Sequence, residues 1–311
     1  MCAAHSAVEP ALANQLVAIS VSDSPDLGRL GLLERSVGET LAALATQLVR
    51  HGARVAYGGN LDQHGFTYQL YPTIAQAYAT AAPRSAQPPF VHYLAAYLAQ
   101  DAEEIAAYLK AVGGIAEVRL VDRDRAVTTI VTHGNEVICS PPNGETRRLT
   151  DLGRLPALVA DTPRRSGGRD MDLDAMREAM EESTTARVII GGRVTGYSGS
   201  KPGILQETLL ALEKKHAVFP LGGFGGASRD AAIALGLLSR DDALDHEETG
   251  PGYNETIDAI ARHARQFRES AQTAGAWSDL VVASKTEDPE TASNHVIRVL
   301  MRRGNSPQTA A

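Results

Sequence analysis

Residues 191–226, GGRVTGYSGSKPGILQETLLALEKKHAVFPLGGFGG, carry the clearest indication of the fold. They begin with a glycine pair that follows a strand predicted at residues 187–190. A helix predicted at 203–215 comes next, and a strand predicted at 217–221 ends in a second glycine pair. Because a strand, a helix and another strand in this order form one unit of a parallel sheet, the segment predicts an α/β protein.

The same alternation occurs near the amino terminus. Strands are predicted at residues 16–20 and 54–57, and helices at 36–51 and 66–81. In the first of these helices, apolar residues recur at the spacing of one buried helical face. We therefore predict a doubly wound, mostly parallel sheet with helices on both faces.

The chain between these two parts is less regular, and we interpret residues 82–168 as a mid-chain insertion. It contains strands predicted at 90–94, 116–121 and 126–131 and a helix predicted at 101–112. Further elements are predicted after it: helices at 171–182, 230–238, 255–274 and 290–303, and an edge strand at 281–283. The predicted organisation is a tail at 1–14, one α/β domain at 15–304 and a second tail at 305–311.

The composition is that of an ordinary globular protein, with 311 residues of which 43% are hydrophobic. Its two cysteines, Cys2 and Cys139, are too few for a disulfide framework or a four-thiolate zinc site, and no histidine spacing indicates a metal. A net charge of -7 argues against a nucleic-acid partner. Since the sequence has neither a long apolar run nor a signal-peptide pattern, we expect no membrane contact and a cytoplasmic location.

Three predicted strands end in glycine pairs, namely Gly58-Gly59, Gly191-Gly192 and Gly222-Gly223. The carboxyl ends of parallel strands meet at one edge of a sheet, and ligands bind in the crevice beyond that edge. Glycine lets a backbone approach a ligand closely, and a helix that starts there points its N–H groups at an anion. The pattern favours a phosphate-bearing ligand over the alternative, which is that the glycines only form tight turns.

Polar side chains near these strand ends are the candidate functional groups. Glu207, early in the helix at 203–215, could accept a hydrogen bond from a ribose hydroxyl or stabilise an oxocarbenium-like centre, or could simply cap the helix. Arg177 has the geometry to bind a phosphate, and the alternative is an ordinary solvated helix residue. Ser20, Ser22 and Asp23 could bind phosphate or sugar, or only form a turn.

Two blocks of the sequence resemble the LONELY GUY (LOG) enzymes, which are cytokinin riboside monophosphate phosphoribohydrolases. Residues 56–59 (AYGG), continuing to Gly65, resemble the first block of the family. Residues 177–180 (REAM) resemble its Arg-x-x-Met helix, and Gly191-Gly192 with residues 203–207 (GILQE) resemble its PGGxGTxxE motif.

The sequence also departs from these enzymes. Ten residues separate the glycine pair from Gly203, the motif's threonine is Ile204, and its paired acids are Gln206 and Glu207. The GGFGG run at 222–226 is not an enzyme hallmark. These departures resemble the wider SLOG (Smf/DprA-LOG) superfamily, particularly the branch associated with TIR and Sir2 domains in bacterial conflict systems.

The resemblance covers residues 15–80 and 170–235 and implies a Rossmann-like fold with a pocket for a nucleotide derivative. Together with the strand ends it gives these candidate ligand-binding residues: Ser20, Ser22, Asp23, Gly58, Gly59, Gly65, Thr67, Arg177, Gly191, Gly192, Lys201, Gly203, Glu207, Gly222, Gly223, Phe224, Gly225 and Gly226. The implied ligands are ADP-ribose-like, cyclic ADP-ribose-like or nucleoside monophosphate molecules, and no further cofactor is required.

Two functions are therefore expected. The first is a sensor that binds such a ligand in a bacterial defence or stress pathway, with a homodimer or larger assembly and an effector protein as partners. The alternative is a LOG-like phosphoribohydrolase that cleaves the N-glycosidic bond of a nucleotide, with Glu207 and Arg177 as catalytic residues. Whether the protein is an enzyme stays open at this point.

Overall fold

The computed structural model describes residues 10–81, 87–162 and 164–304. The strands in these ranges are β1 (Leu16–Ser22), β2 (Arg54–Gly58), β3 (Phe90–Ala95), β4 (Ala116–Val121), β5 (Val127–His133), β6 (Glu136–Ser140), β7 (Arg147–Leu149), β8 (Ala186–Gly191) and β9 (Ala217–Leu221). They form one sheet in the order β7-β6-β5-β4-β3-β2-β1-β8-β9. The strands from β4 to β9 in this order pair in parallel, and β5, β6 and β7 pair antiparallel. The predicted α/β fold with a mostly parallel, Rossmann-like sheet is confirmed.

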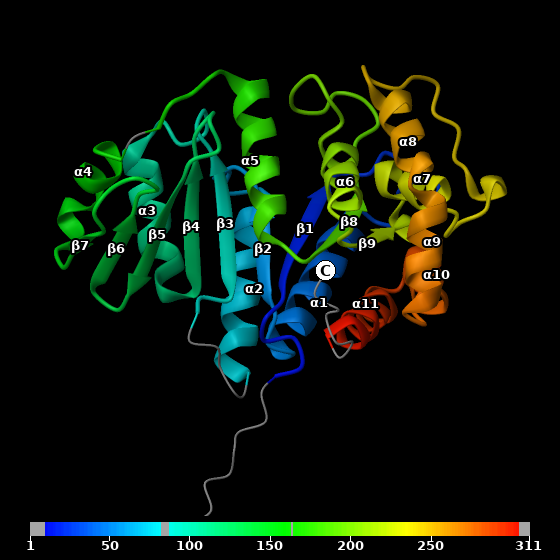
Figure 1. Cartoon of the computed structure of the whole chain (residues 1–311), viewed down its shortest axis with the longest axis horizontal. Helices are drawn as coiled ribbons and strands as arrows, with labels where there is room; N and C mark the ends of the chain where they lie inside the picture. Colours follow the sequence, from blue (N-terminus) through cyan, green and yellow to red (C-terminus); the bar gives the residue numbers. More distant parts are fainter. Residues whose placement is uncertain (1–9, 82–86, 163, 305–311) are drawn as a thin grey trace, which may run out of the picture.

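Helices cover both faces of this sheet (Figure 1). They are α1 (Arg35–Arg50), α2 (Phe66–Thr80), α3 (Ala102–Val112), α4 (Leu155–Ala160), α5 (Arg169–Ser183), α6 (Gly203–Glu213), α7 (Gly226–Ala234), α8 (Tyr253–Arg262), α9 (Ala264–Thr273), α10 (Trp277–Lys285) and α11 (Pro289–Gly304). Helix α1 contacts α2 and α11 behind the sheet in Figure 1, and α5 contacts α6 in front of it. This is the doubly wound arrangement predicted from the sequence.

Residue size explains how α5 sits on the sheet. Met176 and Met180 of α5 pack against Ala18 and Ala56, two small residues at the centres of β1 and β2. Short strand side chains let the helix lie close to the sheet, and the apolar contact fixes its rotation. Arg177, next to Met176, is thereby held over the carboxyl ends of the strands.

The amphipathic pattern of α1 is borne out. Leu41, Leu44 and Leu48 are fully buried against the opposite face of the sheet, and the chain leaves the helix through Gly52 with a φ of +89°. Glycine tolerates this left-handed conformation without the steric penalty that other residues meet.

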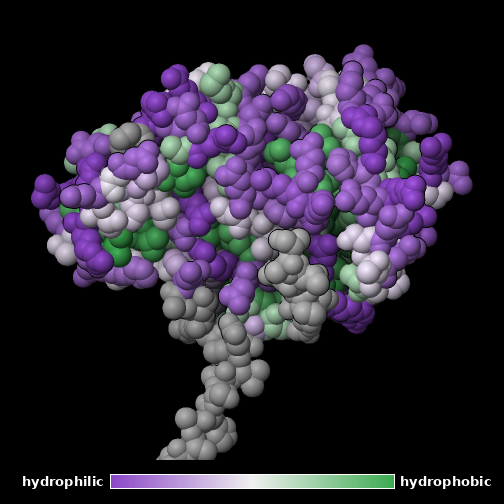
Figure 2. Space-filling view, in the orientation of Figure 1, coloured by the Kyte–Doolittle hydropathy of each residue, from purple (hydrophilic) through white to green (hydrophobic). Residues whose placement is uncertain are grey.

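On the face drawn in Figure 2, hydrophilic residues dominate and hydrophobic residues gather in smaller patches.

The stretch predicted as an insertion is part of the sheet. It supplies β3 and β4, which continue the parallel order, and then the antiparallel strands β5 to β7. Its sequence pattern looked irregular because β5 and β6 alternate between buried and half-buried residues, whereas the parallel strands are buried on both faces. Residues 82–86 and 163 lie outside the described ranges.

Two predictions towards the carboxyl terminus are wrong. Residues 281–283 belong to helix α10 and not to an edge strand, because Leu280, Ala283 and Ser284 form one buried helical face. A three-residue apolar run does not distinguish the two states. The helix predicted at 255–274 is two helices, because the N–H of His263 bonds to the carbonyl of Ile260 in a tighter turn that ends α8.

The predicted tails at residues 1–14 and 305–311 lie mostly outside the described residues. Residues 10–14 form a turn, in which Leu12 is 1% exposed and its N–H bonds to the carbonyl of His51. This part is therefore packed on the core. Within the described residues, no helix combines the length and apolar character needed to cross a membrane.

Candidate functional site

A polar cavity of about 590 Å³ lies beyond the carboxyl ends of β1 and β2. The predicted site residues that line it are Ser20, Ser22, Asp23, Gly58, Gly59, Gly65, Arg177, Gly203 and Glu207. They come from the ends of two strands, from α5, and from the amino-terminal ends of α2 and α6. The structure thus brings half of the predicted residues together at the predicted edge of the sheet.

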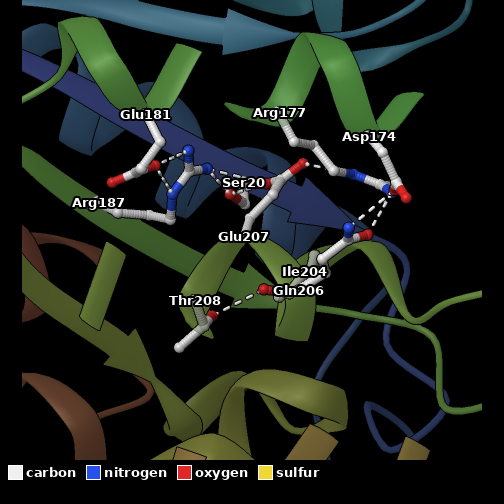
Figure 3. Close-up of polar contacts among 9 residues, drawn as sticks. All are labelled: Ser20, Asp174, Arg177, Glu181, Arg187, Ile204, Gln206, Glu207 and Thr208. Atoms are coloured by element: carbon white, nitrogen blue, oxygen red, sulfur yellow. Dashed lines mark hydrogen bonds and ion pairs between the residues drawn. The ribbon is translucent and has the colours of Figure 1, made fainter. Parts of the chain in front are cut away.

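Glu207 stands between two arginines (Figure 3). One carboxylate oxygen, Oε2, lies 2.9 Å from Nη1 of Arg187 and also accepts a hydrogen bond from the hydroxyl of Ser20. The other, Oε1, lies 3.4 Å from Nε of Arg177. The side chain of Glu207 is 12% exposed, so the carboxylate is neutralised by its neighbours while still reaching the cavity.

Arg187 forms the buried side of this network. It is fully buried in β8 and pairs with Glu181 of α5, which in turn contacts Nδ1 of His216 at 2.7 Å. Burial alone would raise the pKa of Glu181, but the charge of Arg187 and the hydrogen bonds from His216 and Arg187 outweigh it and lower the pKa. Every nitrogen of the Arg187 guanidinium has a partner within the chain.

Arg177 forms the cavity side. Its Nη1 donates to Oε1 of Gln206 at 2.7 Å and lies 3.4 Å from Asp174, which also accepts from Gln206 and Lys201. These contacts and the charge of Arg177 hold the pKa of Asp174 below its usual value, although burial acts in the opposite direction. Nε of Arg177 is buried and has no hydrogen-bond partner in the part of the chain that the structure describes.

Glycine has a specific role where Arg177 crosses α6. A side chain on Gly203 would place its Cβ 2.6 Å from Nη2 of Arg177, and one on Gly58 would lie 2.9 Å from Met176. The bare backbone at these two positions therefore lets α5 and its guanidinium approach the cavity. At Gly58 the missing side chain makes room for Met176 of α5, whereas the sequence had predicted close approach of the backbone to a ligand.

Two helices begin at the cavity without a side-chain cap. Gly65 precedes α2 and Pro202 precedes α6, and neither helix has a capping side chain among the described residues. The first N–H groups of a helix have no partner inside the helix and carry its positive end. Both helix starts can therefore donate hydrogen bonds to an anion in the cavity.

The other predicted residues do not line the cavity; they are Thr67, Gly191, Gly192, Lys201, Gly222, Gly223, Phe224, Gly225 and Gly226. Thr67 is buried and donates to the carbonyl of Asn60, and Lys201 lies outside with Asp174. Gly191 has a φ of +64°, and a Cβ there would lie 2.5 Å from the carbonyl of Ser22. Gly191 therefore packs directly against the backbone of β1, and a Cβ on Gly192 would meet the side chain of Ala227.

The GGFGG run is also structural. Oδ2 of Asp26 accepts a hydrogen bond from the N–H of Gly226 at 2.7 Å, at the start of α7, and Asp26 is 1% exposed. A Cβ on Gly223 would lie 2.0 Å from the carbonyl of Thr286. The anion that this helix start attracts is therefore a carboxylate of the chain itself.

Several residues of the site, in its buried network and in the cavity wall, were not anticipated from the sequence. Arg187 could have been noticed as a charged residue within a strand that is otherwise apolar, but its partners lie on other elements. Phe66, Tyr97 and Tyr197 line the cavity with aromatic rings, and Tyr57 lies beside them, with a pKa raised by burial and then by the charge of Glu207. Their scattered positions give no motif.

No cluster of three or more His, Cys, Asp or Glu residues suited to a metal ion occurs in the described residues.

Arg193 and Asp23, at the open side of the cavity, form an exposed ion pair at 2.8 Å. The wall of the cavity therefore contains both hydrogen-bond donors and acceptors.

Comparison with protein families matches most of the chain to a family model. The family model described as SLOG cluster2 matches residues 11–143 and 160–290, which include every element that lines the cavity. A search of curated proteins finds no match to the chain. The family supports a nucleotide-related, LOG-like function in general terms. With most of its length matched, the chain belongs to the SLOG cluster2 family.

Proposed function

We propose that the cavity binds a nucleotide-derived small molecule and that the protein acts as a sensor of it. The candidates are ADP-ribose-like, cyclic ADP-ribose-like and nucleoside monophosphate ligands. The observation that carries the proposal is Arg177: it is 6% exposed and lines the cavity, and its buried Nε makes no hydrogen bond in the described residues, with Oε1 of Glu207 3.4 Å away. A buried guanidinium with an unused donor favours a bound anion.

The cavity contains matching groups for each part of such a ligand. A phosphate would lie near Arg177 and the uncapped starts of α2 and α6. Ribose hydroxyls would donate to Glu207 or Asp23, whose carboxylates line the same cavity. The base would stack on the aromatic rings of Tyr97 or Tyr197.

The engagement of Glu207 favours binding over hydrolysis. A carboxylate that is already paired with two cations has less charge left to stabilise a positive transition state. Here Oε2 is bonded to Arg187 and Ser20, and Oε1 faces Arg177. Phosphoribohydrolase activity is the second candidate, because Glu207 and Arg177 are adjacent at the cavity wall as that reaction would need.

The wider role is part of the proposal and rests on the resemblance seen in the sequence. We propose action in a bacterial defence or stress pathway, in the cytoplasm, through a homodimer or larger assembly and an effector protein. Ligand binding of this kind requires neither a metal nor a further cofactor, and nucleic acid is not among the proposed partners.

Incubation with AMP, NAD or ADP-ribose, followed by chromatography, separates the two candidates. We expect unchanged nucleotide and no released base or ribose phosphate. Release that disappears in Glu207→Gln but persists in Glu213→Gln would establish the hydrolase and overturn the sensor. Glu213 is the matched control because it is an exposed acid on the same helix and does not line the cavity.

A further inference from the structure

A second cavity, of about 100 Å³, lies at the opposite end of the sheet. It is enclosed by the start of β9 and by α9, α10 and α11, which lie at the lower right of Figure 1. Its walls are largely apolar and include Phe219, Phe267, Leu280 and Val299. A hollow of this kind favours a small hydrocarbon group.

The titratable groups that line this cavity are all basic. Lys215, His216, His263 and Arg303 line it, and no acidic residue in the described ranges does. His216 is paired with Glu181, but Lys215, His263 and Arg303 have no ion pair with an acid in the parts of the chain that the structure describes. The rim of the cavity therefore lacks the anions that usually balance clustered basic groups.

Arg303 is the most informative of these residues. Its side chain is half-buried beside Val299, one turn earlier on α11, and burial lowers its pKa. A partly desolvated guanidinium without a counter-ion is unfavourable, and a carboxylate placed against it would restore the balance through two parallel hydrogen bonds.

We propose that this cavity is a binding site for a small organic acid, with its carboxylate at Arg303 and its hydrocarbon part between Phe219, Phe267 and Val299. The cavity of about 100 Å³ is smaller than the dry cavity of ~150 Å³ that accepts benzene, so a short chain or a ring enters it only with the carboxylate end left at the open rim. Benzoate and hexanoate are suitable probes. The site is separate from the nucleotide cavity, and the proposal does not depend on the proposed function.

Calorimetric titration of the full chain with benzoate, hexanoate, benzyl alcohol and inorganic phosphate tests both halves of the site. We expect the two carboxylates to bind at least tenfold more tightly than either the neutral alcohol or phosphate. Equal binding of benzyl alcohol would overturn the role of the basic rim, and equal binding of phosphate would overturn the role of the apolar walls. Absence of binding by both carboxylates would overturn the proposal as a whole.

Two variants and a control locate the binding. Arg303→Gln should weaken benzoate binding at least tenfold, whereas Arg265→Gln, which removes an 89% exposed charge on α9, should leave it unchanged. Ala271→Leu should fill the cavity from α9 and abolish binding, with thermal unfolding used to verify that the variant is folded. If Ala271→Leu does not fold, the comparison of Arg303→Gln with Arg265→Gln tests whether benzoate binds at this cavity. Equal weakening by both of these would overturn the proposal.

Discussion

The two sides of Glu207 carry similar groups but are built differently. On the buried side, Arg187 uses all of its nitrogens on Glu181, Ser20 and Glu207 and is shielded from water. On the cavity side, Arg177 leaves Nε without a hydrogen bond within the described chain and reaches the cavity wall. The comparison indicates that the saturated, buried arginine maintains the site, whereas we propose that the arginine at the cavity wall contacts the ligand.

The largest effect is expected from removing the buried arginine. Arg187→Met leaves the carboxylates of Glu181 and Glu207 buried without their common partner, and should lower the free energy of unfolding by about 3–5 kcal/mol. Urea unfolding measures the loss. The comparison variant, Arg177→Met, leaves Glu207 paired with Arg187 and should lower the free energy of unfolding by less than half as much. Equal losses of stability in the two variants would contradict the distinction between a buried, structural arginine and an arginine at the cavity wall.

His92 is a second buried titratable group, and neither of its ring nitrogens has a hydrogen-bond partner among the described residues. It is fully buried in β3 among Tyr57, Phe90 and Tyr108, and burial lowers its pKa to about 3. Below the unfolded-state pKa near 6.5, the unfolded chain takes up a proton that the folded protein excludes. Stability is therefore lost as the pH falls from about 6.5 towards 3, by about 1.4 kcal/mol per pH unit.

Replacing His92 with Phe should remove this contribution, because the ring would pack in the same aromatic cluster without titrating. Urea unfolding at pH 6, 5 and 4 measures the slope for the wild type and the variant. His133→Gln, at an exposed position of β5, is the control and should retain the wild-type slope. An unchanged slope in His92→Phe would show that His92 is protonated in the folded state.

A smaller effect is expected at the start of α7, where the chain supplies its own anion. Asp26→Ala should remove the acceptor for the N–H of Gly226 and lower the free energy of unfolding by about 1 kcal/mol. Asp23→Ala, an exposed position in the same loop, should change the free energy of unfolding much less. If the two variants are equally stable, Asp26 does not hold this helix start.

The smallest effect on stability, but a specific one on binding, is expected from Gly203→Ala. Alanine favours the helix, so the free energy of unfolding should stay within about 1 kcal/mol of the wild type. The added Cβ would displace the guanidinium of Arg177 and weaken ADP-ribose binding by about three- to tenfold. Gly28→Ala, where nothing lies within 4 Å, is the control; unchanged affinity in Gly203→Ala would mean that the position of Arg177 is not critical.

The sequence predicts the parallel layers of this fold well because their signals are local. The leucine spacing of α1 and the glycine pair after β2 each lie within one or two elements. The short run at residues 281–283 was misassigned because its burial depends on Leu280 and Ser284 in the folded helix, a context that three apolar residues do not reveal.

The candidate site was predicted less completely because its decisive contacts are long-range. Ser20 and Glu207 are 187 residues apart, and Asp26 and Gly226 are 200 residues apart. Sequence spacing found glycine at three strand ends, but could not show that Asp26 occupies the start of α7. It likewise placed Arg187 in a strand without revealing that Glu181 and Glu207 neutralise it.

Calorimetric titration with AMP, ADP-ribose and cyclic ADP-ribose tests the central claim most directly, with wild type and Arg177→Met measured side by side. We predict that the wild type binds at least one of the three and that Arg177→Met binds it at least tenfold more weakly while staying folded. Equal affinity of the two proteins, or no binding of any of the three by the wild type, would contradict the account.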